Sequence, residues 1–308
     1  MSYKAFLEVL KDTYQQYLPE EFKGCELEIT SVLKNNGVKL EAIRFVKNKT
    51  DIVPTVYPEH YYEELKKIKT NEEIIKQIVE DGCQINNGLK SLLNSNNIKD
   101  NITFQLINAR NNKEILENIP YRMFNNLAVV YRWIVNIDES GVQSTLVTNA
   151  LVKTQLNDMT ENELFNLAYK NTKRLFPPVI NSMAEVIQKL INKDEMPEEL
   201  FDEYDVMQNN MRMYIITNNK GINGASSIIY IKDTLGQLAD KLQQDLYVLS
   251  SSIHEVIAMP VGDLIPKDLV DIVKDINASV VLEQEVLSNS VYLYNRAEEQ
   301  LNVVASIV

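Results

Sequence analysis

Residues 127–137 read Leu-Ala-Val-Val-Tyr-Arg-Trp-Ile-Val-Asn-Ile, and almost every position in this stretch is apolar. Such a run is typical of a β-strand covered on both faces, because a strand with one wet face alternates apolar and polar residues. A turn is predicted at residues 138–141, and residues 144–153 are predicted to return as the antiparallel partner. Residues 102–109 predict another strand. The stretch therefore predicts the centre of an antiparallel sheet.

Towards the N-terminus, apolar residues at helical or alternating spacing predict helices around one hairpin. The predicted elements are helix 3–18, strands 27–33 and 40–46, helix 59–68 and helix 71–81. Asn35-Asn36-Gly37 supplies the positive φ that a tight hairpin needs. The alternation slips at Ala42-Ile43, which predicts a bulge. Thr70 with Glu73 forms a capping-box pattern at the start of the last helix.

The C-terminal half repeats this mixture. Thr160 with Glu163 predicts the start of helix 161–175, and residues 179–192 are predicted to resume as helix after Pro177-Pro178. A helix from Pro266 carries Leu269, Val273 and Ile276 on one face. The other predicted elements are strands 212–217 and 225–231, helix 234–243, strands 245–250 and 253–259, and strands 291–295 and 302–307.

The resulting order in the C-terminal half is α, ββαββ, α, ββ. The whole chain is predicted to be an α+β protein in which antiparallel hairpins dominate. We expect two regions: an N-terminal α+β region over residues 1–157, and an acidic α+β region with a ββαββ core over residues 158–308.

The composition argues against several classes of partner. The 308 residues carry a formal net charge of −12, of which −1 falls on residues 1–157 and −11 on residues 158–308. Neither half shows the basic patch that neutralises phosphates, so we expect no binding to nucleic acid and none to an anionic membrane surface. No stretch of 18 apolar residues predicts a membrane span. Two cysteines that need not pair, and no signal-like N-terminus, favour a cytoplasmic protein.

Residues 194–205 hold the densest charge in the chain. Seven acids fall there: Asp194, Glu195, Glu198, Glu199, Asp202, Glu203 and Asp205. The simpler interpretation is a solvated acidic loop or short helix. The alternative is a docking surface for a basic protein partner.

Several segments resemble one bacterial family. Residues 213–231 (MYIITNNKGINGASSIIYI), followed by residues 245–257 (DLYVLSSSIHEVI), are similar to the domain of unknown function 5688 family. Further similar segments run in the same order through the chain: 34–37 (KNNG), 54–62 (PTVYPEHYY), 120–132 (PYRMFNNLAVVYR), 175–177 (LFP) and 285–296 (EVLSNSVYLYNR). The resemblance implies no established activity.

His254 and Glu255 follow the serines Ser251 and Ser252, and this is the most suggestive polar site. A Ser–His hydrolase would need such residues, but the chain has no Gly-x-Ser-x-Gly elbow, and Ala258 stands where a zinc protease has its second histidine. Adjacent residues of a strand also point to opposite faces. The alternatives are a structural histidine near a turn, a ligand contact and a catalytic group.

Two other segments could bind something. Asn223, in the Gly221–Gly224 segment, fits an ordinary turn or a weak phosphate-cradling loop. His60 and Tyr61 belong to an aromatic segment that fits core packing or a partner-binding cluster, because tyrosine combines apolar area with a polar end.

Arg132 lies inside an apolar strand, and Arg296 follows one. Each must meet a carboxylate, a carbonyl or a ligand anion, so an internal salt bridge and an anion pocket are the alternatives. Cys25 and Cys83 are interpreted as buried, inert thiols. The spacing of cysteines and histidines predicts no metal site, and no motif indicates a cofactor.

These features favour a non-enzymatic interaction or regulatory protein whose partner is another protein bound through the acidic C-terminal half. The alternatives are a hydrolase-like enzyme and a small-ligand sensor, each with a site near Ser250–Glu255.

Overall fold

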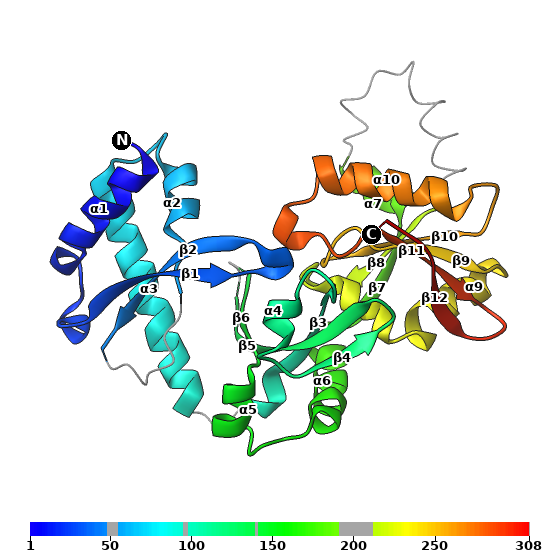
Figure 1. Cartoon of the computed structure of the whole chain (residues 1–308), viewed down its shortest axis with the longest axis horizontal. Coiled ribbons are helices and arrows are strands. Elements are labelled where there is room, and N and C mark those ends of the chain that lie inside the picture. The colour runs from blue at the N-terminus through cyan, green and yellow to red at the C-terminus, as the bar shows by residue number, and fades with distance from the viewer. Residues whose placement is uncertain (48–54, 95–97, 139–140, 191–211, 308) are drawn as a thin grey trace. The chain divides into compact units, whose positions relative to one another are not determined.

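The fold mixes helices with antiparallel sheets, which confirms the predicted α+β class (Figure 1). The computed structural model describes residues 1–47, 55–94, 98–138, 141–190 and 212–307. By internal contacts the chain forms two compact units, of which unit 1 is Met1–Lys99 with Val135–Gln143, and unit 2 is Asp100–Ile134 with Ser144–Val308. This division differs from the predicted boundary after residue 157.

Unit 1 packs helices against one hairpin. Its elements are α1 (Tyr3–Thr13), β1 (Glu26–Leu33), β2 (Lys39–Val46), α2 (Pro58–Leu65) and α3 (Asn71–Asn94). Pro58 begins α2, where the missing N–H costs nothing. The Thr70–Glu73 capping box begins α3 as predicted. Side chains of α1, β2, α2 and α3 form one buried apolar cluster, and the partly buried Leu27 of β1 packs against it, so the unit has its own core.

Two local predictions in unit 1 are wrong. β1 and β2 pair in continuous register, without the bulge expected at Ala42-Ile43. Both residues are fully buried, because β2 is covered on both faces there, and Val56 pairs with Ile43 at its other edge. The third helix also continues past residue 81. Gly82 lies inside it, where a Cβ would approach the Phe45 ring to 2.6 Å, so this glycine serves close packing rather than helix termination.

Four described strands form the first sheet, which belongs to unit 2 except for Val135–Gln143. They are β3 (Ile102–Asn108), β4 (Tyr121–Phe124), β5 (Leu127–Asp138) and β6 (Gly141–Leu146), in the order β3-β5-β4 with β6 also paired to β5. The central strand, β5, therefore coincides with the apolar stretch 127–137 that was predicted to form the centre of a sheet. The predicted return strand is too long. It ends at Leu146, and the Thr148 hydroxyl then caps helix α5 (Asn149–Gln155) by accepting from the Leu151 N–H.

The second sheet of unit 2 has six strands in the order β12-β11-β9-β10-β8-β7. They are β7 (Pro178–Ser182), β8 (Tyr214–Asn218), β9 (Leu246–Leu249), β10 (Val256–Pro260), β11 (Ser290–Asn295) and β12 (Gln300–Ser306). In the part of the chain that the structure describes, the α-helices of this unit are α4 (Lys113–Leu116), α5, α6 (Glu161–Leu175), α7 (Met183–Leu190), α9 (Gln237–Leu242) and α10 (Pro266–Ser279). Helix α6 packs on β3, and α10 packs on β9, β11 and β12. Within the described residues, no helix is long and apolar enough to cross a membrane.

Two predicted elements of the C-terminal half are wrong. Residues after Pro177 form strand β7 before α7 begins, instead of one helix over 179–192. Residues 225–231, predicted as a strand of the ββαββ unit, lie mainly in the 3₁₀ helix Gly224–Ile229. There the Ser226 and Ser227 hydroxyls donate to the carbonyls of Asn223 and Thr217. Such side-chain bonds to the backbone favour compact turns over an extended ladder.

The turn between β4 and β5 connects the two sheets of unit 2. Asn125 adopts a left-handed conformation, with φ of 57°, and its side chain donates to the Leu301 carbonyl at 3.0 Å. The Asn126 amide donates to the Ser290 hydroxyl at 2.8 Å and accepts from the Tyr292 hydroxyl. A short polar turn therefore fixes the first sheet to the edge of the second.

A half-buried polar cluster fixes α6 to the first sheet. Tyr131 of β5 is fully buried, and its hydroxyl donates to the Glu161 carboxylate at the start of α6. The Arg122 guanidinium pairs with the same carboxylate, with Nη2 2.7 Å from Oε2, and lies 4.0 Å from the centre of the Phe165 ring. Burial is the main cause that raises the pKa of Tyr131, and the hydrogen bond to Glu161 raises it further. The hydroxyl therefore stays protonated and remains a donor.

We expect Tyr131→Phe to destabilise the protein by about 1.5–3 kcal/mol, the range for losing a hydrogen bond to a charged group. The measurement is urea unfolding at neutral pH. Tyr121→Phe on β4 is the matched control, because that ring is 41% exposed, and it should change the unfolding free energy by less than about 0.5 kcal/mol. Equal losses from the two substitutions would contradict the assigned role of the buried hydroxyl.

Candidate functional site

The polar site predicted around His254 forms where three segments of unit 2 meet. Strand β8 runs antiparallel to β10, with Ile216 opposite Val256, so the end of β8 lies beside the segment that precedes β10. The third segment precedes β11 and includes Glu285. It pairs with residues 250–253, since the Ile253 N–H donates to the Glu285 carbonyl at 2.8 Å.

Both ring nitrogens of His254 face a partner. The Asn223 backbone N–H donates to Nδ1 at 3.3 Å, and Nε2 lies 3.6 Å from Oε1 of Glu285. Because Nδ1 accepts a hydrogen bond, the neutral ring carries its proton on Nε2, where it faces the carboxylate. The imidazole therefore links the loop after β8 to the segment before β11. This geometry supports a structural role more than that of a free base.

The backbone around His254 is packed tightly against Gly224. A Cβ at position 224 would lie 2.2 Å from the Thr217 hydroxyl oxygen and 2.4 Å from the His254 carbonyl oxygen. These two oxygens are themselves bonded, since the Thr217 hydroxyl donates to the His254 carbonyl at 2.8 Å. Only glycine fits this approach, which holds Asn223 within reach of the imidazole.

The neighbouring predicted residues are half-buried. The Ser252 hydroxyl accepts from the His254 backbone N–H at 3.0 Å, so its described bond is to the backbone rather than to the ring. Ser251 contributes its carbonyl, which accepts from the Leu287 N–H at 2.8 Å. Glu255 is also half-buried, immediately before β10. The described bonds of the two serines thus fix the chain and do not form a Ser–His pair.

Asn223 is in the left-handed region, with φ of 53°, and precedes the 3₁₀ helix. The loop before it is closed by Asn218, whose side chain donates to the Ile222 carbonyl at 2.8 Å and accepts from the Lys220 N–H at 2.9 Å. This arrangement supports the turn interpretation over a phosphate-cradling loop.

The two predicted arginines lie elsewhere in unit 2 and bind protein groups. Arg132 of β5 donates from Nη1 to the Gln105 side chain at 3.0 Å, and from Nε to the Ser144 hydroxyl at 2.8 Å. Arg296 pairs through Nε with Asp240 at 2.7 Å, and its backbone N–H donates to Asp245 at 2.8 Å. Arg296 therefore pairs with a carboxylate of the same chain, and this ion pair is exposed.

His60 and Tyr61 belong to α2 of unit 1. The His60 ring is exposed and lies 3.3 Å from the Glu64 carboxylate. The Tyr61 hydroxyl donates to Asp81 at 2.9 Å, and burial together with this carboxylate raises the pKa of Tyr61. Tyr62, the next residue, is buried in the core, so the segment is divided between the core and the surface.

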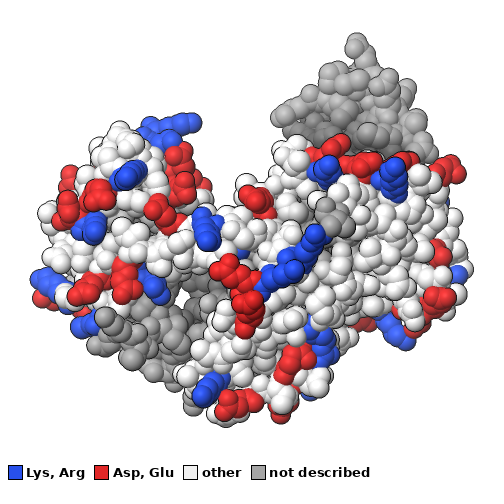
Figure 2. Space-filling model, viewed as in Figure 1, with Lys and Arg blue, Asp and Glu red and all other residues white. Residues whose placement is uncertain are grey.

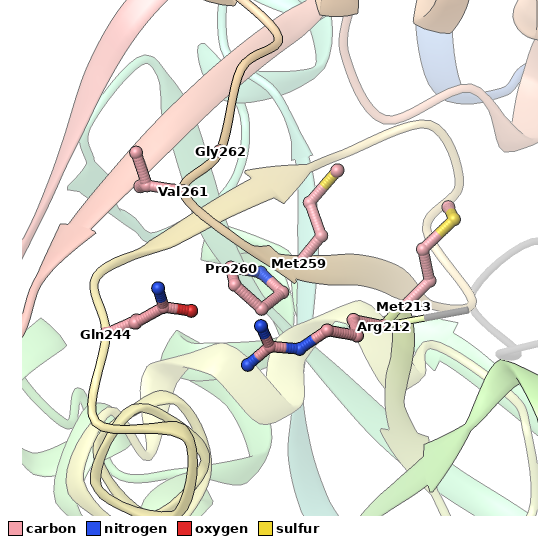
Figure 3. A pocket seen from close by; sticks show the side chains of 7 residues that line it. All are labelled: Arg212, Met213, Gln244, Met259, Pro260, Val261 and Gly262. Carbon is pink, nitrogen blue, oxygen red and sulfur yellow. The ribbon is translucent and has the colours of Figure 1, made fainter. Parts of the chain in front are cut away.

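A shallow hollow of about 440 Å³ lies at the opposite end of the strands from His254 (Figure 3). It is lined by Arg212, Met213, Gln244, Met259, Pro260, Val261 and Gly262. Strand β10 begins just after His254 and ends at Pro260, and β8 begins just after Met213. In Figure 3 the Arg212 and Gln244 side chains extend toward Pro260 from two sides. The hollow is therefore separate from the serine and histidine residues.

The remaining polar candidates carry little chemistry. Cys25 and Cys83 are free and buried in the core of unit 1, and burial, followed by the nearby Cys25 and Glu21, raises the pKa of Cys83 to about 12. Such a thiol is unreactive at neutral pH, in line with the interpretation as inert. Among the described residues, no three His, Cys, Asp or Glu side chains converge to hold a metal ion. The acidic stretch 194–205 lies outside the residues that the structure describes.

Sequence reasoning missed three residues of the His254 site: Glu285, Thr217 and Gly224. Glu285 begins one of the family-like segments, but it lies 31 residues from His254 and no spacing connects the two. For Gly224 the sequence predicts only a place in a turn. The pairing of β8 with β10 brings these residues together, and that pairing has no local signal.

The fold and the site define an α+β protein in which His254 belongs to a hydrogen-bonded polar junction. The chain belongs to a family of unknown function, DUF5688, whose model matches residues 3–296. Comparisons with curated proteins and with solved structures found no match.

We expect Gly224→Ala to destabilise unit 2 by an amount at or above the upper end of the about 1–3 kcal/mol typical of overpacking, because the new methyl group meets backbone and a bonded hydroxyl. Gly262→Ala is the matched control, since no atom lies within 4 Å of its Cβ position, and it should be neutral or slightly stabilising. Thermal unfolding of both variants tests this. A Gly224→Ala protein as stable as the Gly262→Ala protein would contradict the close approach.

The link through His254 predicts different effects for two substitutions. In His254→Asn, the amide oxygen can replace Nδ1 as the acceptor for the Asn223 N–H, whereas His254→Leu leaves that donor unpaired. We expect the leucine variant to be less stable than the asparagine variant by about 1 kcal/mol, measured by urea unfolding. If the two variants unfold at the same urea concentration, the bond to Nδ1 contributes nothing to stability.

Proposed function

We propose that this protein is a non-enzymatic cytoplasmic binding protein that recognises another protein through helix α10 and the residues flanking it. The supporting observation is a row of aliphatic side chains exposed to solvent there. Its members are Leu264, Ile265, Ile272, Ile276, Val280 and Leu282, here called the α10 apolar surface. Large exposed apolar patches on soluble proteins commonly mark sites of protein interaction.

The side chains of the α10 apolar surface are well exposed. Ile265, Ile272 and Val280 are 55%, 45% and 77% exposed. The adjoining side of the helix is buried against the six-stranded sheet through Leu269, Val270 and Val273. Fold stability requires only the buried side, so the exposed aliphatic residues are free to serve another purpose. Single exposed apolar residues are ordinary, but here six fall within nineteen positions, on and beside one helix.

The alternative function, a hydrolase or a small-ligand sensor near Ser250–Glu255, has less support. It is favoured by the partial exposure of the His254–Glu285 pair, whose side chains are 31% and 34% exposed. It is weakened by the imidazole geometry, because Nδ1 accepts from the Asn223 N–H and is not free to take a substrate proton. The binding function therefore accounts for more of the described surface.

Site-specific photo-crosslinking in the native host tests the proposed function. A benzoylphenylalanine at position 272 or 276 is expected to give the same protein adduct, and one at position 267 or 274 to give none, because those lysines lie on the other side of α10. Absence of an adduct at 272 and 276, or equal adducts at all four positions, would count against the proposal.

A double substitution provides the control for folding. Ile272→Gln with Ile276→Gln removes apolar surface that is already exposed, so the unfolding free energy should change by less than about 0.5 kcal/mol per site. The adduct formed from a photo-crosslinker at position 265 should nevertheless be lost in this background. An adduct that persists in the folded double variant would show that the α10 apolar surface does not carry the binding.

A further inference from the structure

We infer that the segment bound by the α10 apolar surface is a basic amphipathic helix of another protein. This inference rests on the proposed function and specifies the partner of the same surface. It is carried by two independent features of α10: the spacing of its apolar residues, and the position of carboxylates for which the described residues provide no ion pair.

The apolar spacing fits a helical partner. The exposed residues Ile272, Ile276 and Val280 follow one another at intervals of four residues. Residues four apart line up on one side of a helix, and such a row is a seam along which another helix packs. Leu269 lies beside this seam and is buried against the sheet. The exposed seam lacks a partner within the described residues.

The charges beside this seam are acidic. Successive residues of an α-helix are turned by about 100°. Asp268, Asp271 and Asp275 therefore lie next to the exposed apolar stripe, on the side of the helix that faces away from the sheet. Lys267 and Lys274 lie on the side of the helix opposite the apolar stripe. Figure 2 shows acidic side chains along the upper edge of α10 and basic side chains beneath them.

The three aspartates are exposed, and the described residues provide no ion pair for their carboxylates. A helix with lysine or arginine flanking its apolar face would supply the missing charges. Other occupants fit less well. A second copy of this chain would bring the same carboxylates together, and the whole chain already carries a net charge of −12. Phosphates of nucleic acid or lipid would be repelled by the same border.

Two designed helical peptides test the charge preference on the full chain. Both are about four turns long, to match α10, and share one apolar face of leucine and isoleucine. One carries lysine at the flanking positions and the other carries glutamate. By fluorescence anisotropy at low salt, we expect the lysine peptide to bind at least about tenfold more tightly, and we expect added salt to reduce this difference by screening.

A matched pair of charge variants separates local from overall charge. Asp271→Lys with Asp275→Lys should reverse the preference between the peptides. Glu8→Lys with Asp12→Lys makes the same change in net charge on α1, at the same four-residue spacing and also at exposed positions, and should leave the preference as in the wild type. Equal effects of the two variants would overturn the inference, because the preference would then reflect only the net charge.

The remaining outcomes distinguish this inference from the proposed function. Equal affinity of the wild type for both peptides, or no affinity for either, overturns the basic-helix inference, while the photo-crosslinking result still decides the binding function. Sedimentation of the chain alone tests self-association. A dimer that Ile272→Gln with Ile276→Gln dissociates would assign the surface to a second copy and would also overturn the inference.

Discussion

The close contact of Gly224 with the His254 carbonyl and the Thr217 hydroxyl is the constraint on which unit 2 depends. It sets the loop after β8 directly against the segment that leads into β10. A side chain at position 224 would separate these segments, and the Asn223 N–H would no longer reach the imidazole. The absence of one Cβ thus fixes the end of two strands and the orientation of the histidine.

This constraint explains why the polar residues that stand out in the sequence form a junction. The Thr217 hydroxyl, the Asn223 N–H and the Glu285 carboxylate each engage His254, and Ser252 bonds to its backbone. Groups bonded in this way stabilise the fold but are not free to bind a substrate. Helix α10 differs, because its aliphatic and acidic side chains face solvent. In this protein the exposed side chains of α10 are therefore a better guide to function than the hydrogen-bonded residues around His254.

Local patterns in the sequence predicted much of the fold. The Thr160–Glu163 capping box, Pro266 at the start of α10 and the apolar run of β5 all lie where they were expected, because each is decided by neighbours in the chain. The strand predicted at residues 225–231 is wrong, because its aliphatic residues resemble a strand pattern while the chain forms a 3₁₀ helix there. Hydroxyl bonds from Ser226 and Ser227 to distant or preceding carbonyls decide their conformation, and those partners cannot be read from spacing.

The same limit applies to α10. Helical spacing placed Leu269, Val273 and Ile276 on one apolar face, but the sheet covers only the first two, and Ile276 remains exposed. Sequence periodicity shows that a helix has an apolar side and cannot show how wide the covering sheet is.

The excess of acidic residues in the C-terminal half also needs the structure before it points to a particular surface. It suggested a basic partner at residues 194–205, whereas the described structure places an acidic border beside apolar side chains on α10. Charge alone would mainly guide and orient a partner, and apolar contact alone would select poorly among partners. A surface with both charge and apolar side chains can orient a partner and bind it. Helix α10 is therefore a better candidate than residues 194–205 for binding a basic amphipathic helix.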